Sequence, residues 1–394
     1  MIDLVKTIVL REWRRIRRDG KPILLVAVFP LAFVAALAIV YAPKKVLRVP
    51  VLIVDQDHSA LSRSLTRAIL ANETYSLGGY ADSVEEFPAL VAQDRAHLCF
   101  VFPRDLERNL RGRREAKVEL MADASNILAG SVEVANAFNL LGTFAVGVEL
   151  RMFEAKTGIT STLALRHALP IQTGMRVWFN PGFTSNYLNF LAVGICTIPI
   201  QLGGFLISIR SGSSEYEEDE KEHLSRMTRN PWAIIAGKVL AYVAIIFPVS
   251  MAVLYTPHVF CGTPMMGSSL ILALMTLWFT SLLVTVGFGL SCLFADPLFA
   301  TEVCALVTLP NFLLSGFTWP VFAMSKVLWV LAYGMPLFSF SFLFRKISLM
   351  GAPAADGLPQ MGILGIWTCI ALVLARLGVH KMMKAGNPGE ISHA

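Results

Sequence analysis

The stretch SLILALMTLWFTSLLVTVGFGLSCLF, residues 269–294, contains no charged side chain. An apolar run of about 20 residues is long enough to cross the hydrocarbon of a bilayer as a helix. Comparable runs lie at about residues 23–41, 186–208, 233–255, 298–315 and 361–379. Charged residues make up only 16% of the chain, against about 25% in a soluble globular domain. The sequence therefore predicts an α-helical membrane protein with six transmembrane helices.

The first 21 residues are basic and amphipathic. Residues 2–18 place Val5, Val9 and Trp13 on one face of a helix and arginines on the other, which is typical of a helix in the membrane interface. A solvated basic helix is the alternative. A basic cluster beside a spanning helix marks the cytoplasmic side. We interpret residues 1–21 as a cytoplasmic amphipathic interfacial helix and residues 22–43 as transmembrane helix 1, with no role in nucleic-acid binding.

Residues 44–183 alternate between strand and helix patterns. The strand patterns lie at Val49–Asp55, Leu77–Tyr80, His97–Phe102 and Lys117–Met121. The helix patterns lie at Ser59–Leu70, Ser83–Gln93 and Ser125–Lys156. In the second of these helices, Ser83 and Glu86 have the spacing of a capping box. This alternation over about 140 residues predicts an α/β domain with its own core, inserted between transmembrane helices 1 and 2.

The distribution of basic residues predicts which segments lie on each side of the membrane. Six crossings put both termini on one side, and the basic N-terminus makes that side cytoplasmic. Residues 184–394 then hold transmembrane helices 2–6, with a charged cytoplasmic loop at 209–232 and a re-entrant or extracytoplasmic region at 316–360. The α/β domain becomes extracytoplasmic. The region 316–360 fits least well, because its basic residues fall on the outer side.

The sequence lacks the common catalytic signatures. It contains no G-x-x-x-x-G-K-[ST] phosphate loop, no H-E-x-x-H and no G-x-S-x-G. We therefore expect no catalytic residue, metal or cofactor in this chain. Asp55, Asp57 and His58 follow a predicted strand and fit either a metal or phosphate-chemistry site or a loop that caps the next helix through Ser59. The loop is the favoured interpretation.

Two ionisable residues lie in or near apolar runs. Glu302 either faces a cavity or a partner at membrane depth, or lies at the wet end of its helix beside Asp296 and Pro297. Lys238 is close to the start of its helix, where its side chain is expected to snorkel to the interface. The loop at 215–224 is dense in charge, and a charged helix between two spans is suited to contact a soluble partner.

Several motifs resemble one known family, the permease subunits of ABC-2-type exporters, in the subgroup with a large extracytoplasmic domain between the first two spans. The most specific is Leu313-Leu314-Ser315-Gly316-Phe317-Thr318-Trp319-Pro320, followed by Met335-Pro336-Leu337. Asn180-Pro181 and Gly237-Lys238 also match. Glu217, Glu222 and Leu224 fall on the family's E-x-G-T-x-E-x-L element, although Asp219 and Glu220 replace its Gly and Thr.

The resemblance implies a dimer of permeases, each docked on a separate ATP-binding subunit that holds the ATP and Mg. The residues expected to couple to the ATPase are Trp13, Glu217, Glu222 and Leu224. The residues expected on the transport path or its gate are Glu302, Ser315, Gly316, Phe317, Trp319 and Pro320. The second permease is another copy or a close paralogue, and a periplasmic adaptor is a further expected partner.

The resulting hypothesis is an ATP-driven exporter of an amphipathic or hydrophobic molecule, drug-like or lipid-like, in the bacterial inner membrane. Two alternatives remain open. One is a non-transporting membrane sensor or scaffold whose outer domain binds a ligand and signals to a cytoplasmic partner. The other is a membrane-embedded enzyme that uses Asp55, Asp57 and His58.

Overall fold

Apolar runs of the sequence form the long helices of one structural unit, and the strand-rich segment forms a second. The computed structural model divides the chain into residues 1–42 with 187–394, the helical unit, and residues 43–186, the α/β unit. The residues that the structure describes are 1–18, 21–40, 47–112, 114–123, 125, 127–157, 193–216, 218–260, 262–294, 296–317, 319 and 321–384.

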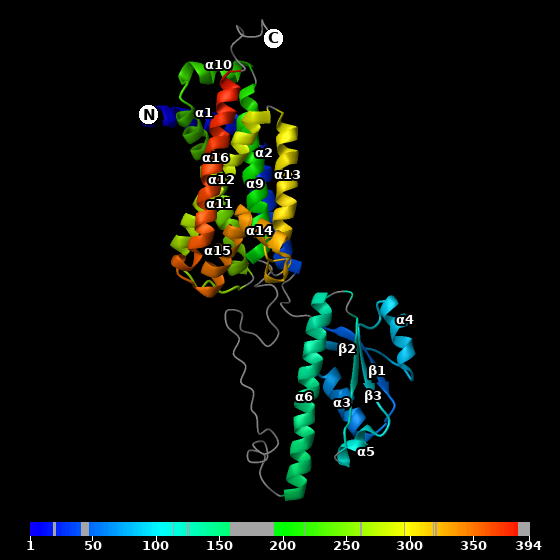
Figure 1. Cartoon of the computed structure of the whole chain (residues 1–394). Helices are drawn as coiled ribbons and strands as arrows, with labels where there is room; N and C mark the ends of the chain where they lie inside the picture. The colour runs from blue at the N-terminus through cyan, green and yellow to red at the C-terminus, as the bar shows by residue number, and fades with distance from the viewer. Residues whose placement is uncertain are drawn as a thin grey trace. The chain divides into compact units, whose positions relative to one another are not determined.

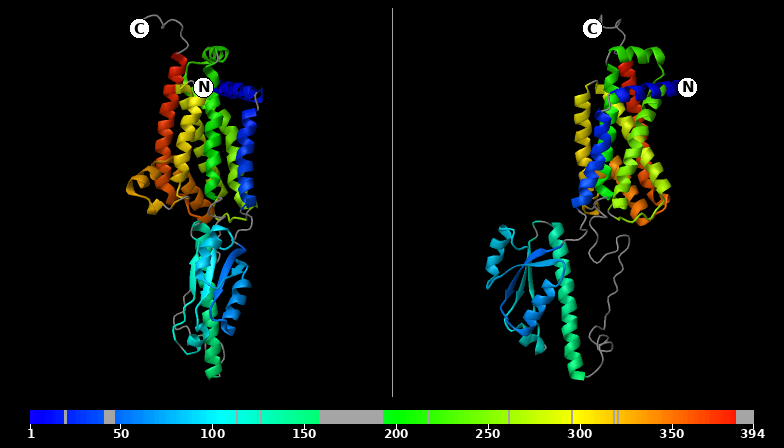
Figure 2. Two further views of the ribbon diagram at one scale, coloured as in Figure 1. Left: turned by 90° about the vertical axis from the view of Figure 1, so that its right-hand side faces the viewer. Right: turned by 180° about the vertical axis from the view of Figure 1, so that it is seen from behind.

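The helical unit contains α1 (Ile2–Arg18), α2 (Lys21–Val40), α9 (Thr197–Ser213), α10 (Glu218–Met227), α11 (Pro231–Phe260), α12 (Ser269–Phe294), α13 (Pro297–Leu313), α14 (Lys326–Gly334), α15 (Pro336–Met350) and α16 (Leu358–Lys384). The long helices run side by side, with α12 packed between α9, α11 and α16 (Figures 1 and 2). Helices α1 and α10 lie crosswise at one end of this bundle, together with the C-terminal end of α16. Helices α14 and α15 lie at the opposite end.

Every apolar run predicted to span the membrane forms a helix over its described residues. Among the described residues, five helices are long and apolar enough to cross a membrane, and four of them, α9, α11, α12 and α16, belong to this unit. Helix α13 is apolar but shorter. Asp296 caps α13 by accepting a hydrogen bond from the N–H of Leu298, and Pro297 occupies the first turn.

Helices α14 and α15 form a bent pair. Their axes differ by 80° across the break at Met335, which precedes Pro336. Proline favours such a break because it has no N–H for the preceding turn and restricts the residue before it. A bend of this size is found in broken spans and in re-entrant hairpins. The sequence predicts that residues 316–360 form a re-entrant or extracytoplasmic region.

The α/β unit is built from a four-stranded sheet in the order β2-β1-β3-β4. Its strands are β1 (Val49–Asp55), β2 (Tyr75–Tyr80), β3 (Leu98–Phe102) and β4 (Glu119–Ala122). Strand β1 pairs in parallel with β2 and β3, and β4 joins β3 antiparallel. Its helices are α3 (Ala60–Leu70), α4 (Phe87–Ala92), α5 (Leu106–Arg111) and α6 (Ile127–Thr157). The sequence predicted the four strands and α3, α4 and α6, and it missed the short helix α5.

The two faces of the sheet carry separate apolar cores, because side chains alternate along each strand. Val51 and Ile53 of β1 point to the face that is covered by α3, α5 and α6. Leu52 and Val54 point to the face that is covered by α4. The long helix α6 is held on its face by Tyr75, whose hydroxyl donates to the Glu133 carbonyl at 2.8 Å.

The start of the second α/β helix corrects one prediction. Ser59 and Ser62 form a reciprocal capping box at the start of α3, but the capping box predicted at Ser83 and Glu86 is not formed. The oxygen of Ser83 instead accepts from the N–H of Glu85, and a short 3-10 turn precedes α4. A 3-10 turn is tighter than an α-helix. The Ser83 side chain therefore accepts from the N–H two residues later, at Glu85, and not from the N–H of Glu86 that a capping box requires.

Candidate functional site

A buried ionic network joins three segments at the end of the helical unit where α1 and α10 lie. Its members are Arg11, Glu12 and Arg15 from α1, Glu215 from the 3-10 turn Ser214–Tyr216 after α9, and Lys238 and Tyr242 from α11. The side chains of Glu12, Glu215 and Lys238 are completely buried. Among the described members, three cations meet two carboxylates, so this described part of the network carries a net positive charge.

Lys238 lies at the centre of this network. Its Nζ donates to Glu12 Oε1 at 3.0 Å, to Glu215 Oε1 at 2.6 Å and to the Ser211 carbonyl at 2.8 Å. These three acceptors satisfy all three ammonium donors. The prediction that Lys238 snorkels to the interface is wrong, because buried acceptors hold its charge inside the unit. A buried ammonium without such partners would be strongly unfavourable.

Two arginines of α1 complete the network. Arg11 donates two parallel hydrogen bonds, of 3.0 and 3.1 Å, to the carboxylate of Glu215. This is the strong bidentate geometry of an arginine–carboxylate pair. Arg15 contacts Glu215 Oε1 at 3.3 Å and Glu12 Oε2 at 3.2 Å. Burial lowers the pKa of the Arg15 guanidinium, but the neighbouring carboxylates outweigh burial and hold that pKa above its ordinary value.

The orientation of α1 differs from the prediction. Arg11 and Arg15 lie on the face that packs on α11, whereas Arg14, Arg17 and Arg18 are exposed as predicted. The helix approaches closely because a Cβ atom at Gly237 would lie only 2.6 Å from Ile8. The periodicity of apolar residues predicted that all arginines of α1 are exposed, because such a pattern assigns every charged residue to the solvent face. It contains no information about carboxylates that distant segments supply.

The residues predicted to couple to an ATPase are divided between buried and exposed positions. Trp13 is 39% exposed and donates its indole N–H to the Ala241 carbonyl at 3.3 Å. Leu224 of α10 is 1% exposed and packs with residues of α11, α12 and α16. Glu222 lies on α10, where its side chain is not described, and Glu217 lies outside the described residues. Leu224 therefore anchors α10 to the bundle.

The predicted break after α13 is present at the other end of the unit. Ser315 donates its hydroxyl to the Phe312 carbonyl at 2.6 Å. Gly316 has φ +81°, and a Cβ atom there would lie 2.9 Å from the Val321 side chain, so this position requires glycine. Phe317 is buried against Gly194, where a Cβ atom would lie 2.2 Å from its ring. Trp319 is half-exposed, and Pro320 lies outside the described residues.

Polar side chains buried on α9 and α13 were missed by the sequence reasoning. Gln201 Nε2 donates to the Thr308 hydroxyl at 3.4 Å. Asn311 is fully buried, and within the described part of the chain neither of its amide atoms has a hydrogen-bond partner. Such groups are costly in an apolar interior and mark functional positions or unseen partners. The sequence did contain a signal for Asn311, because a polar amide within the apolar run 298–315 is unusual. Glu302 is exposed in the early part of α13.

The segment Asp55–His58 forms a cap. Asp55 Oδ1 accepts from the backbone N–H groups of Asp57 and His58, and Asp55 Oδ2 accepts from the Ser62 hydroxyl at 2.8 Å. Asp57 accepts from the N–H of Glu107 at the start of α5. Among the described residues, no group of three or more His, Cys, Asp or Glu side chains could hold a metal ion. These contacts support the loop interpretation over an enzymatic site.

Comparison with known proteins gives the family. The sequence profile of the ABC-2 family transporter proteins matches residues 21–377, which include the whole α/β unit and the helical unit from α2 into α16. The chain therefore belongs to the ABC-2 transporter family. The resemblance inferred from the Ser315–Pro320 motif is confirmed.

Two relatives of this ABC-2 protein come from Escherichia coli K12. The chain is 23% identical to the probable multidrug ABC transporter permease YbhS over 381 residues, which cover 95% of each chain. It is also 23% identical to the probable multidrug ABC transporter permease YbhR over 354 residues, which cover 87% of this chain and 90% of the relative. The family and the apolar helices together indicate a multi-pass inner-membrane permease that works with an ATP-binding partner.

Proposed function

We propose that this chain is the transmembrane subunit of an ATP-driven exporter that moves an amphipathic or hydrophobic molecule out of the cytoplasm or the inner leaflet. A separate subunit binds and hydrolyses ATP with Mg, and this chain supplies no cofactor-binding residue. Both termini are cytoplasmic in this proposal, and the α/β unit is extracytoplasmic. A second permease, identical or closely related, completes the transporter, and the α/β unit is available to a periplasmic adaptor.

The ionic network is the observation that carries the proposal. Exporters driven by a separate ATPase need a rigid link between the docking surface and the spanning helices, because coupling requires an element that both sites bias. Here α1 and α10 lie crosswise at the same end of the bundle (Figure 2). Glu215, just before α10, is joined by hydrogen bonds to Arg11 of α1 and to Lys238 of α11. A force on α10 is therefore transmitted to α1 and α11 together.

The docking surface is proposed at the exposed parts of α1 and α10. Trp13 is the exposed aromatic residue of α1, Glu217 and Glu222 supply negative charge, and Leu224 holds α10 in place. The transport path is proposed along α9 and α13, where Gln201 and Asn311 present buried amide groups. The break from Ser315 to Pro320 would act as its outer gate, and exposed Glu302 would face the path or the second permease.

The test uses the permease reconstituted with its ATP-binding subunit. The Glu217→Lys and Glu222→Lys double variant should lose co-purification of the ATPase, whereas Glu86→Gln, an exposed carboxylate of the α/β unit, should retain it. Candidate amphiphiles should stimulate ATP hydrolysis and move across vesicles that contain both subunits. Intact co-purification in the double variant would refute the docking surface.

The sensor or scaffold hypothesis is kept as a second candidate, because the α/β unit has an apolar groove beside α6. The two hypotheses differ in their observable outcome. An exporter moves its cargo in sealed vesicles when ATP is supplied. A scaffold binds ligand without any ATP-dependent movement of cargo, and this result would replace the export proposal.

A further inference from the structure

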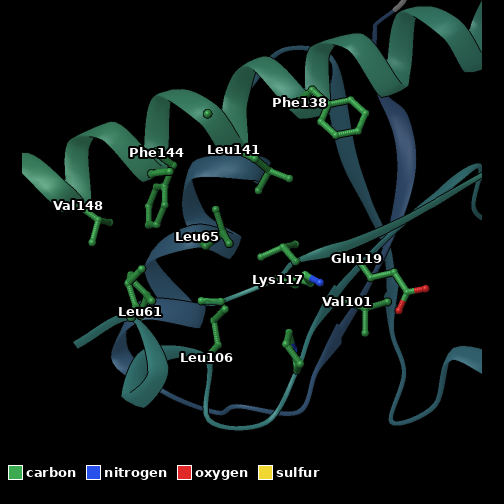
Figure 3. Close-up of a pocket in the computed structure, with 16 residues that line it drawn as sticks. Leu61, Leu65, Val101, Leu106, Lys117, Glu119, Phe138, Leu141, Phe144 and Val148 are labelled. Atoms are coloured by element: carbon green, nitrogen blue, oxygen red, sulfur yellow. The ribbon is translucent and has the colours of Figure 1, made fainter. Parts of the chain in front are cut away.

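An apolar groove of about 780 Å³ lies in the α/β unit between α6 and the opposite wall formed by α3, α5 and the start of β4 (Figure 3). Phe138, Leu141, Phe144 and Val148 line it from α6, and they face Leu61, Leu65 and Leu106 on the other wall. Its volume falls within the range of about 300–1,000 Å³ that is usual for small-molecule sites, which are mostly apolar with a few polar groups.

A second compartment of about 470 Å³ shares four lining residues with this groove: Leu61, Leu110, Phe144 and Val148. The walls that it adds are basic, with Arg67 from α3, Arg111 from α5 and Arg151 from α6. Glu107 also lines it and forms an ion pair with Arg111. The two compartments are therefore adjacent: the first is lined mainly by apolar side chains, and the second adds three arginines beside it.

Two of the three arginines have no carboxylate partner among the described residues of the α/β unit. Arg67 donates its Nε to the Arg63 carbonyl. In the described α/β residues, neither Arg67 nor Arg151 forms an ion pair with a carboxylate. Two guanidinium groups at the end of an apolar groove favour an anion, and the planar guanidinium group matches carboxylate, sulfate and phosphate oxygens.

The groove is open to an occupant. Phe138 is 63% exposed, and only 11% of the apolar segment Gly130–Met152 of α6 is buried. A Cβ atom added at Gly142 or Gly147 would meet nothing within 4 Å. Contiguous exposed apolar surface of this kind marks interaction sites. A second copy of the chain would cover apolar surface equally well, but it would leave the arginine cluster unexplained.

We propose that the α/β unit binds a free single-chain anionic amphiphile. Its hydrocarbon chain lies between α6 and the wall made by α3 and α5, and its carboxylate or sulfate group lies at Arg67 and Arg151. We assign one hydrocarbon chain because the apolar groove of about 780 Å³ adjoins the arginines as a single compartment. The proposal does not depend on export, because binding at this site requires neither ATP nor the ATP-binding subunit.

The experiment uses the full chain in nanodiscs of neutral phosphatidylcholine and a fatty acid that carries a photoreactive diazirine near the end of its chain. Cross-links are mapped by mass spectrometry. We expect cross-linked peptides from α3, α5 and α6. The matched probe with a trimethylammonium head should label them much less.

Substitutions separate the groove from general membrane partitioning. Gly142→Leu should remove most labelling because its side chain fills the groove, and Ala145→Leu provides a second filling variant should the first fail to fold. Ala135→Leu, an exposed position of the same helix outside the groove, should leave labelling unchanged. The charge reversals Arg67→Glu and Arg151→Glu should each lower labelling by about two- to five-fold, as expected for exposed ion pairs, whereas Arg63→Glu should not.

Several outcomes would overturn the proposal. Absence of cross-links in the groove, as expected if another protein surface covers it, is one. Equal labelling by the cationic probe, or labelling that is unchanged in both filling variants, is another. Loss of labelling when phosphatidylglycerol is added to the nanodiscs would assign the site to a two-chain lipid instead of a free amphiphile.

Discussion

Replacing Lys238 by methionine and Glu215 by glutamine should destabilise the helical unit by unequal amounts. In Glu215→Gln, the described part of the network keeps the cations Arg11, Arg15 and Lys238 but retains only the carboxylate of Glu12. Removing one partner from a buried ionic cluster typically costs about 3–5 kcal/mol. Arg11 loses both of its hydrogen bonds to a carboxylate, and Lys238 loses its shortest one.

In Lys238→Met, the described members of the network are balanced in charge, because two arginines still face two carboxylates. The hydrogen bonds that Lys238 makes to charged groups stabilise the fold by about 1.5–3 kcal/mol each. The desolvation of the ammonium group, which opposes folding by several kcal/mol, disappears in the same variant. Methionine has a similar volume and fills the site beside the Phe288 ring. We therefore expect a net loss of only about 0–2 kcal/mol.

The assay is unfolding by SDS titration in mixed micelles, followed by tryptophan fluorescence, for both variants and for the double variant. Because the two residues are in direct contact, the double-mutant cycle should give a coupling energy of about 0.5–3 kcal/mol. Lys326→Met and Glu86→Gln, which alter exposed side chains, should stay within about 0.5 kcal/mol of the parent protein. A larger loss for Lys238→Met than for Glu215→Gln, or additive losses, would refute this reasoning.

Three further predictions concern single positions. Gly316→Ala should destabilise the protein by about 1–2 kcal/mol, because the φ angle of Gly316 is positive. The control Gly334→Ala should not, because a Cβ atom there would meet no atom within 4 Å. Equal unfolding midpoints for the two variants in the same SDS titration would contradict this prediction. The Cys99 thiol should resist modification by maleimide between pH 7 and pH 9, because burial raises its pKa to about 12 and keeps the thiol protonated. Rapid labelling of Cys99 in the folded protein, measured by mass spectrometry, would exclude the buried position. Leu224→Ala should cost about 2–5 kcal/mol of stability by opening a cavity under α10, and it should weaken co-purification of the ATPase. The control Leu10→Ala, at a 45% exposed position, should leave the unfolding midpoint nearly unchanged. A Leu224→Ala variant with the stability of the parent protein would exclude the anchoring role of Leu224.

Much of the fold could be predicted from local patterns. The apolar runs became helices because their length and composition satisfy the bilayer and the backbone at once. The strands of the α/β unit followed from short apolar segments between turn residues, and Val49–Asp55 has the predicted limits. The break at Gly316 was predicted from neighbouring residues, and its positive φ is a property of that single position.

Errors arose where a side chain's surroundings are set by distant residues. Lys238 is separated by 226 positions from Glu12, one of its partners, so no sequence window contains both the charge and its compensation. Helix α5 was missed because a segment of six residues is too short to show a clear period. Asn311 is fully buried and has no hydrogen-bond partner among the described residues, and its burial could not be predicted from its neighbours in the sequence.

The length of the apolar segments predicted that this chain spans a membrane, and the alternation of strand and helix patterns predicted the α/β unit between helices α2 and α9. The resemblance to ABC-2 permeases came from short motifs such as Ser315–Pro320. Those properties depend on neighbouring residues, which the order of the chain places together. The direction in which Arg11 and Arg15 point, the burial of Lys238 and the groove beside α6 arose only when remote segments packed together. Electrostatic and packing energies depend on distances in space, and the folded chain alone sets those distances.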